Sequence, residues 1–304
     1  MFPDIVGIGA PKSGTTSFVR ALDATGDFDV CRMKDSDILS GCDLLRAEAA
    51  YETEFSGDGR PKVDFSVLYF LSEMASANCQ SFEKLPKIVF LARDPIDQIR
   101  SHYWHLRRQH FHSWETKDVT PTLADLLNNE PDRIVSASLY AKNLRMWPWE
   151  DPEHFFFLTF EELIDRPSES LRRFARFCDV ELSSNSERLF IQELGKKHRS
   201  GVKPRSRAHE AIYNRLYLFA ISGPYHGLKH VLGVPVADRI KESLRLRQLA
   251  QRIFFNNNNI QDEDQDDIIP EWAVELLEED KKELSLMFPG HLTYWTSARS
   301  TSRV

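Results

Sequence analysis

Short apolar runs alternate with longer amphipathic segments along the first 180 residues. Clusters of β-branched and aromatic residues predict buried strands at 4–9, 28–33, 62–67, 87–92 and 154–159. Period-3.6 patterns predict helices between them, chiefly at 15–24, 95–108, 123–128, 131–147 and 161–178. Strands that alternate with helices form βαβ units. We therefore predict an α/β fold with a mainly parallel central sheet flanked by helices.

The pattern changes after residue 180, where helices and loops replace the strand runs. A basic segment, KKHRSGVKPRSR, spans Lys196–Arg207, and an acidic one, DEDQDD, spans 262–267. An amphipathic pattern then resumes from Ile268 to Trp295. No linker divides the chain, so we expect a single domain over 1–304. Its α/β core would occupy 1–180, and a helical and loop part at 181–304 would complete the site.

Composition narrows the classes of function. The chain of 304 residues has 39 Lys+Arg and 46 Asp+Glu, a formal net charge of −7. An acidic balance argues against a nucleic-acid partner, but it leaves room for a local cationic pocket. The four cysteines form no CxxC motif, and no segment has the pattern of a secretory signal or a transmembrane helix. These features predict a cytoplasmic protein.

A glycine-containing loop, GAPKSGTT, joins the first predicted strand to the first predicted helix. Free N–H groups at a helix N-terminus, together with the helix dipole, favour a phosphate-like group there. The spacing is that of a P-loop, but Thr15 stands where the lysine should be, and Lys12 lies earlier in the loop. A kinase would also need a carboxylate for Mg²⁺. The strand at 87–92 continues instead into Arg93.

Three cations, Lys12, Lys34 and Arg93, each follow a different predicted strand. Ligands of open parallel sheets bind beyond the carboxyl ends of the strands. A guanidinium and a hydroxyl suit a phosphate group, and Ser101 lies eight residues after Arg93. The alternative is structural: Arg93 would pair with a neighbouring aspartate, Asp94 or Asp97, and Ser101 would lie on a helix surface.

Two of these segments resemble known motifs. PKSGTTS (11–17) is similar to the 5′-phosphosulfate loop of sulfotransferases that use 3′-phosphoadenosine 5′-phosphosulfate (PAPS). IVFLARDPIDQIRSHYW (88–104) resembles their 3′-phosphate motif. The stretch 155–180 is similar to the family's strand–Glu-Asp-Leu–helix segment, and the end near 291–295 resembles bacterial members. The resemblance implies a single α/β domain with a parallel sheet, in agreement with the pattern above.

The resemblance also implies roles for individual residues. Lys12 would contact the bridging oxygen and the sulfonate, while Arg93 and Ser101 would hold the 3′-phosphate. The 5′-phosphate would lie against Ser13, Gly14, Thr15, Thr16 and Ser17. The basic segment would close over the nucleotide, with Arg199, Lys203 and Arg205 as candidate contacts. Fixed cations would then do the work of a metal, so no metal ion is expected.

The acceptor's base is a separate question. The segment after the second strand resembles the Lys-Glu segment of heparan-type sulfotransferases, and this similarity places Asp35 in the role of base. The alternative for Asp35 is the N-cap of the next helix. A second group of candidates is the histidine cluster after Arg93, in which His105 ranks first: His102, His105, His110 and His112. The chain departs from the heparan-type pattern at Phe65, where those enzymes have a lysine.

The prediction is therefore a PAPS-dependent sulfotransferase, nearer the carbohydrate-directed branch than the cytosolic small-molecule branch. Its acceptor would be a hydroxyl or amine, most plausibly of a glycan or glycolipid, and its product adenosine 3′,5′-bisphosphate. Two alternatives stay open on the sequence alone. One is a P-loop small-molecule kinase that uses Mg-ATP, and the other is a non-catalytic nucleotide-binding protein.

Overall fold

A computed structural model describes the residues 2–109, 122–196, 203–204, 255–256 and 268–297. Contacts along the chain divide it into two compact units. The first comprises residues 1–102, 123–198 and 269–304, and the second comprises 103–122 and 199–268. The C-terminal segment thus belongs to the same unit as the N-terminal segment. Each unit is described by itself below.

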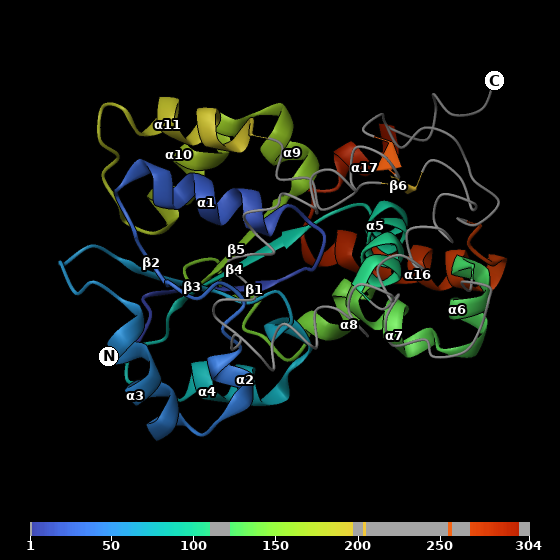
Figure 1. Ribbon diagram of the computed structural model, residues 1–304, viewed down its shortest axis with the longest axis horizontal. Coiled ribbons are helices and arrows are strands. Elements are labelled where there is room, and N and C mark those ends of the chain that lie inside the picture. Colours follow the sequence, from blue (N-terminus) through green and yellow to red (C-terminus); the bar gives the residue numbers. More distant parts are fainter. Residues whose placement is uncertain (1, 110–121, 197–202, 205–254, 257–267, 298–304) are drawn as a thin grey trace, which may run out of the picture. The chain divides into compact units, whose positions relative to one another are not determined.

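The first unit is built around a sheet of five parallel strands in the order β2-β3-β1-β4-β5 (Figure 1). The strands are β1 (Ile5–Gly9), β2 (Asp29–Val30), β3 (Lys62–Phe65), β4 (Lys87–Ala92) and β5 (Phe155–Thr159). In register, Ile5 lies opposite Val63 and Lys87. The predicted α/β class and parallel sheet are confirmed. The second strand is shorter than expected because the chain then turns towards α3, and the Arg32 N–H donates to the Glu54 carbonyl at 3.2 Å.

Helices cover both faces of this sheet (Figure 1). On one face lie α1 (Thr15–Thr25), α10 (Pro167–Phe177) and α11 (Ser186–Leu194). Their core includes Phe18, Phe174 and Phe190, whose rings meet edge to face. On the other face lie α2 (Ile38–Gly41), α3 (Leu44–Glu54), α4 (Glu73–Gln80), α8 (Tyr140–Leu144) and α16 (Glu271–Met287). Because helices bury both faces of the sheet, the side chains on both sides of the strands are almost all apolar.

Two predicted helices are broken in the structure. The segment 161–178 forms α9 (Phe160–Asp165) and then α10, because Pro167 cannot donate to the preceding turn and begins a new helix. The segment 131–147 divides into α7 (Pro131–Val135), the 3₁₀ turn η3 (Ser136–Ser138) and α8. The predictions of single helices there were wrong. Helices α2, α3 and α4, and the 3₁₀ turn η1 (Tyr69–Leu71), were not predicted.

The remaining elements are α5 (Pro95–Gln109), α6 (Leu123–Asn129) and α17 (Thr293–Ser297). The second unit contains the last residues of α5 and a short antiparallel pair, β6 (Lys203–Pro204) and β7 (Phe255–Asn256). In that pair Lys203 lies opposite Asn256. Within the described ranges, no helix is both long enough and apolar enough to cross a membrane.

Candidate functional site

The glycine loop joins β1 to α1, as predicted. Gly14 precedes α1 with φ 80°, and a Cβ there would lie 2.4 Å from a ring carbon of Phe160. Only glycine meets both conditions, the left-handed backbone and the close approach of the aromatic ring. Lys12 also has a positive φ, 65°, which is unusual for a lysine. At Lys12 the loop thus holds a backbone conformation that a lysine does not favour, and such backbone strain clusters at binding sites.

The start of α1 is arranged as an anion site. The first N–H groups of a helix have no partner inside the helix, and Gly14 provides no side-chain cap here. No acidic residue lies in the first turn of this 11-residue helix. Thr15 is buried there, while Thr16 and Ser17 are half-buried. The helix dipole and these amides together favour a bound anion.

Arg93 follows β4 and reaches the same loop. Its Nη1 lies 3.5 Å from the Lys12 carbonyl oxygen, and its guanidinium lies 5.2 Å from the centre of the Phe160 ring. It also forms an ion pair with Asp97 at 3.8 Å. The structural alternative raised for Arg93 is therefore present, but it is not the whole description, since the same side chain borders the loop that carries Lys12.

Gln98 is a contact of the loop that the sequence did not reveal. Its side chain is fully buried on α5, and its Nε2 donates to the Pro11 carbonyl at 3.0 Å. Its Oε1 in turn accepts from the Ser138 hydroxyl. Ser101 lies one helical turn after Gln98 and is half-buried. The sequence itself shows only a glutamine three residues before Ser101, and its burial is seen in the structure alone.

Three buried polar atoms around the loop have no hydrogen-bond partner among the described residues: Ser13 Oγ, Arg93 Nε and Tyr140 Oη. Ser13 is 0% exposed and Tyr140 is 1% exposed. Burial raises the pKa of Tyr140, and polar groups of Ser13 and of the Arg93 backbone beside the phenol oppose that rise. Native proteins satisfy nearly all such atoms, so a group of them calls for a ligand or water.

The segment that carries Asp35 lies at the carboxyl end of β3, beside β1. The Asp35 N–H donates to the Phe65 carbonyl at 3.2 Å, and its Oδ1 accepts from the Val67 N–H at 3.3 Å. Its Oδ2 lies 2.6 Å from Lys34 Nζ. Asp35 is not an N-cap: that position of α2 belongs to Asp37, which makes no capping hydrogen bond. The structural alternative for Asp35 was thus wrong.

A buried carboxylate supports this segment from beneath. Asp64 on β3 is fully buried and accepts hydrogen bonds from three hydroxyl groups, those of Ser36 (3.2 Å), Tyr69 (2.8 Å) and Tyr51. Burial raises the pKa of Asp64, and the three donors oppose the rise. Burial and the nearby Asp35 likewise raise the pKa of Asp37, whose N–H donates to Ser66 Oγ at 3.0 Å.

Phe65 has a structural role at the position where heparan-type sulfotransferases have a lysine. Its side chain is buried, and a Cβ on Gly7 would lie 2.0 Å from the Phe65 ring. Gly7 is therefore required because the ring lies against β1. Phe65 also packs edge to face with Phe18, so this position belongs to the core under α1.

The remaining predicted residues lie in other parts of the chain, and some of them fall outside the described residues. His105, on α5, and Lys203, in β6, belong to the second unit. His102 belongs to the first unit. Arg199 and Arg205 lie outside the described residues, as do His110 and His112. The structure thus brings together the loop residues 12–17 and Arg93, and it places Asp35 at the same edge of the sheet.

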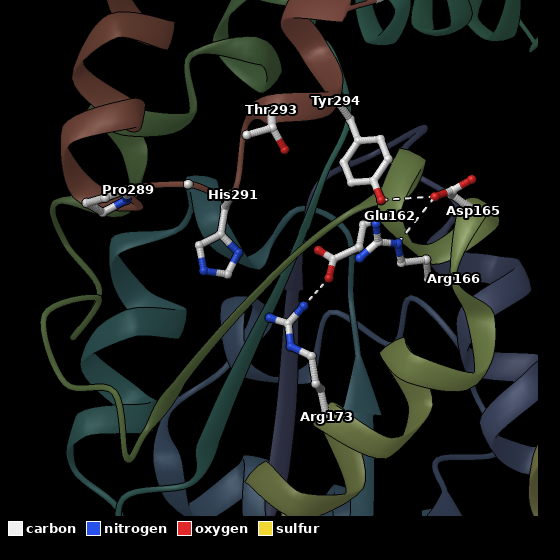
Figure 2. A pocket seen from close by; sticks show the side chains of 9 residues that line it. Glu162, Asp165, Arg166, Arg173, Pro289, His291, Thr293 and Tyr294 are labelled. Atoms are coloured by element: carbon white, nitrogen blue, oxygen red, sulfur yellow. Dashed lines mark hydrogen bonds and ion pairs between the residues drawn. The ribbon is translucent and has the colours of Figure 1, made fainter.

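Figure 2 shows a separate pocket of about 550 Å³, between α9–α10 and the segment 289–294. None of the residues predicted from the sequence lines it. Its charged side chains pair with one another: Arg173 binds Glu162, and Asp165 accepts from the Tyr294 hydroxyl at 3.0 Å. This internal compensation leaves little to attract a charged ligand. Across the described part of the chain, no group of three or more His, Cys, Asp or Glu residues is arranged to hold a metal ion.

Fold and loop together define a parallel α/β protein with a strand–loop–helix whose first helical amides favour an anion. The chain belongs to the sulfotransferase domain family, whose model matches residues 2–210, and so to a family of enzymes. It is similar to heparan sulfate glucosamine 3-O-sulfotransferase 3A1 of Mus musculus, with 25% identity over 170 residues, or 51% of this chain and 43% of that protein. The chain thus spans less than half the length of this relative.

The fold is also that of a solved relative, a sulfotransferase from Alicyclobacillus acidocaldarius. The TM-score is 0.50 at 20% identity, and the match covers 73% of this chain and 96% of the other. At this identity the likeness supports the architecture alone. It agrees with the α/β architecture described above.

Proposed function

We propose that the protein transfers a sulfuryl group from PAPS to a hydroxyl or amine of a carbohydrate or glycolipid acceptor. The donor assignment rests chiefly on one observation. The glycine loop brings Lys12 and Arg93 to a helix N-terminus, and in and beside it lie buried polar atoms that have no partner among the described residues. An anion with several phosphate oxygens fits such a set of donors. The residues present therefore fit the donor that the family uses.

In this proposal different residues bind different groups of the donor. The amides of Gly14 to Ser17, at the start of α1, hold the 5′-phosphate, with Ser13 beside them. Lys12 stabilises the charge that develops on the bridging oxygen. Arg93 and Ser101 hold the 3′-phosphate, and Arg199, Lys203 and Arg205 of the 181–304 part would complete the nucleotide site. PAPS supplies the activated sulfuryl group, and no metal-assisted step is invoked.

The proposed chemical step transfers the sulfuryl group directly from the donor to the acceptor. The acceptor oxygen or nitrogen forms a bond to sulfur as the bond between sulfur and the bridging oxygen breaks. The electron pair of that bond leaves with adenosine 3′,5′-bisphosphate, and the acceptor proton goes to the base. Asp35 is the proposed base, because it lies at the carboxyl edge of the sheet and is partly exposed. His105 is the second candidate.

The acceptor class is the finer part of the proposal. A relative that shares 25% identity is named for action on heparan sulfate glucosamine, which supports a carbohydrate acceptor. Phe65, however, turns a position near Asp35 into core, so the acceptor side differs from the heparan-type pattern. We therefore propose a glycan or glycolipid, and we do not carry over heparan sulfate itself.

Thermal unfolding with nucleotides tests the donor assignment. Adenosine 3′,5′-bisphosphate at about 100 times its dissociation constant should stabilise the protein by about 2.7 kcal/mol. ADP with Mg²⁺ is the comparison, since a P-loop kinase would be stabilised by that pair. Stabilisation by ADP and Mg²⁺ alone would refute the sulfotransferase donor site. Binding of adenosine 3′,5′-bisphosphate without sulfuryl transfer to any sugar acceptor would favour the non-catalytic alternative.

A further inference from the structure

Tyr140 is a buried residue that neither the motifs nor the proposed reaction uses. It begins α8, and its ring packs against Phe90 (5.5 Å between ring centres) and Trp295 (6.2 Å). Tyr140 is 1% exposed, yet its hydroxyl has no hydrogen-bond partner among the described residues. A buried phenol usually finds one. The Ser13 side chain and the Arg93 backbone are the polar groups that lower the pKa of this phenol.

The turn that carries Tyr140 already supports the glycine loop at a second point. Ser138, two residues earlier, donates to Gln98, and Gln98 donates to the Pro11 carbonyl at 3.0 Å. The loop is thus held at Pro11 by a complete chain of hydrogen bonds. Two residues further on, the Ser13 side chain lies near enough to lower the pKa of the Tyr140 phenol, yet neither hydroxyl group makes a hydrogen bond within the described residues.

The far side of this turn is anchored by α16. The carboxylate of Asp280 accepts from the N–H groups of Ala141 and Lys142, both at 3.0 Å. Asp280 lies nine residues before Pro289, in the C-terminal segment of the chain. A carboxylate at the first turn of α8 fixes the backbone from which Tyr140 projects. These two hydrogen bonds therefore anchor the first turn of α8, the helix that Tyr140 begins.

We propose that Tyr140 is a positioning residue of the donor site, whose hydroxyl pairs with the Ser13 side chain when a phosphate occupies the glycine loop. The pairing would fix the loop in the conformation that presents Lys12 and the helix amides to the 5′-phosphate. This inference rests on the proposed donor. It explains why the hydroxyl groups of Ser13 and Tyr140 are both buried and both without partners.

The test is the Tyr140→Phe variant, which removes one oxygen atom and keeps the ring packing. We expect its dissociation constant for adenosine 3′,5′-bisphosphate, measured by calorimetry, to rise about tenfold. Its unfolding midpoint without nucleotide should stay at the wild-type value, because the hydroxyl makes no hydrogen bond to any residue that the structure describes. A purely structural tyrosine would show the reverse pattern. An unchanged dissociation constant would overturn the proposal.

A double-mutant cycle with Ser13→Ala identifies the route of the effect. If Tyr140 acts through Ser13, the loss from Tyr140→Phe should disappear in the Ser13→Ala background. A loss that persists in full there would overturn the pairing. Should Tyr140→Phe fail to fold, Ser13→Ala alone must show the tenfold rise, and wild-type affinity in that variant would refute the proposal. Failure of the wild-type protein to bind the nucleotide would instead refute the donor site itself.

Discussion

Two loops at the carboxyl edge of the sheet rest on buried polar clusters of different kinds. The segment 34–37 lies over Asp64, which accepts three hydroxyl hydrogen bonds, from Ser36, Tyr51 and Tyr69. The glycine loop contains Ser13 and is bordered by Tyr140, and the hydroxyl groups of these two residues have no partner among the described residues. Both loops contain non-glycine residues with positive φ, namely Lys12, Asp35 and Asp37.

The contrast separates two ways of supporting strained backbone. A complete network holds the 34–37 segment in place before any ligand arrives, so the proposed base is preorganised. In the glycine loop, the hydroxyl groups without partners among the described residues would, under the proposal, be paired only when the donor binds. Changes near Asp64 should therefore alter stability and the chemical step. Changes near Ser13 should alter donor affinity.

The largest effect is expected for Lys12→Ala in the glycine loop. Removing a cation that stabilises a leaving oxygen typically costs about 10²–10³ in kcat, and we expect the upper end of that range. The fold should be retained, because Lys12 lies in a loop and not in the core. Steady-state transfer assays with saturating acceptor measure the loss. The control is Lys84→Ala, an exposed lysine remote in sequence from both loops. Wild-type turnover in Lys12→Ala would remove Lys12 from the mechanism.

Asp35→Asn is the next in size and tests the 34–37 segment. We expect kcat to fall about 10²-fold at saturating donor, while the affinity for adenosine 3′,5′-bisphosphate stays unchanged. The amide keeps the shape of the side chain and can still accept from the Val67 N–H. Asp37→Asn is the matched control, since it changes a carboxylate two residues away. An unchanged rate in Asp35→Asn would transfer the role of base to His105.

The position of the glycine loop could be predicted from the sequence because strand, loop and helix are contiguous there. The roles of Lys12 and of residues 13–17 came from the resemblance to sulfotransferases and stay predictions. Arg93 was also predictable, since it directly follows β4, which neighbours β1 in the sheet. The parallel sheet followed from the same alternation of apolar strands and amphipathic helices.

The supports of both loops were not predictable, because they come from distant segments. Tyr140 and Gln98 reach the glycine loop from α8 and α5, and their sequence patterns show only helices with an apolar face. Tyr51 reaches Asp64 from α3, in a region where no helix was predicted. Burial of a polar side chain is a tertiary property, so a single sequence gives no direct sign of which polar residues will be buried together.

The smallest expected effect, in Tyr69→Phe, gives the sharpest test of the comparison. The Tyr69 hydroxyl donates to Asp64 at 2.8 Å, lies 3.2 Å from Ser36 Oγ and accepts from the Leu39 N–H at 3.3 Å. Its loss leaves a buried carboxylate short of one donor, which should lower the free energy of unfolding by about 1–3 kcal/mol, measured by urea denaturation.

The matched variant is Tyr140→Phe, which removes the same atom from a buried tyrosine whose hydroxyl has no hydrogen-bond partner in the described part of the chain. If the two clusters differ as described, Tyr69→Phe reduces stability and keeps donor affinity, whereas Tyr140→Phe keeps stability and reduces donor affinity. Equal losses of stability in both variants would show that the Tyr140 hydroxyl is satisfied in the free protein, for example by a buried water. In that case the glycine loop, like the 34–37 segment, would be fully supported before the donor binds, and the distinction between the two loops would fall.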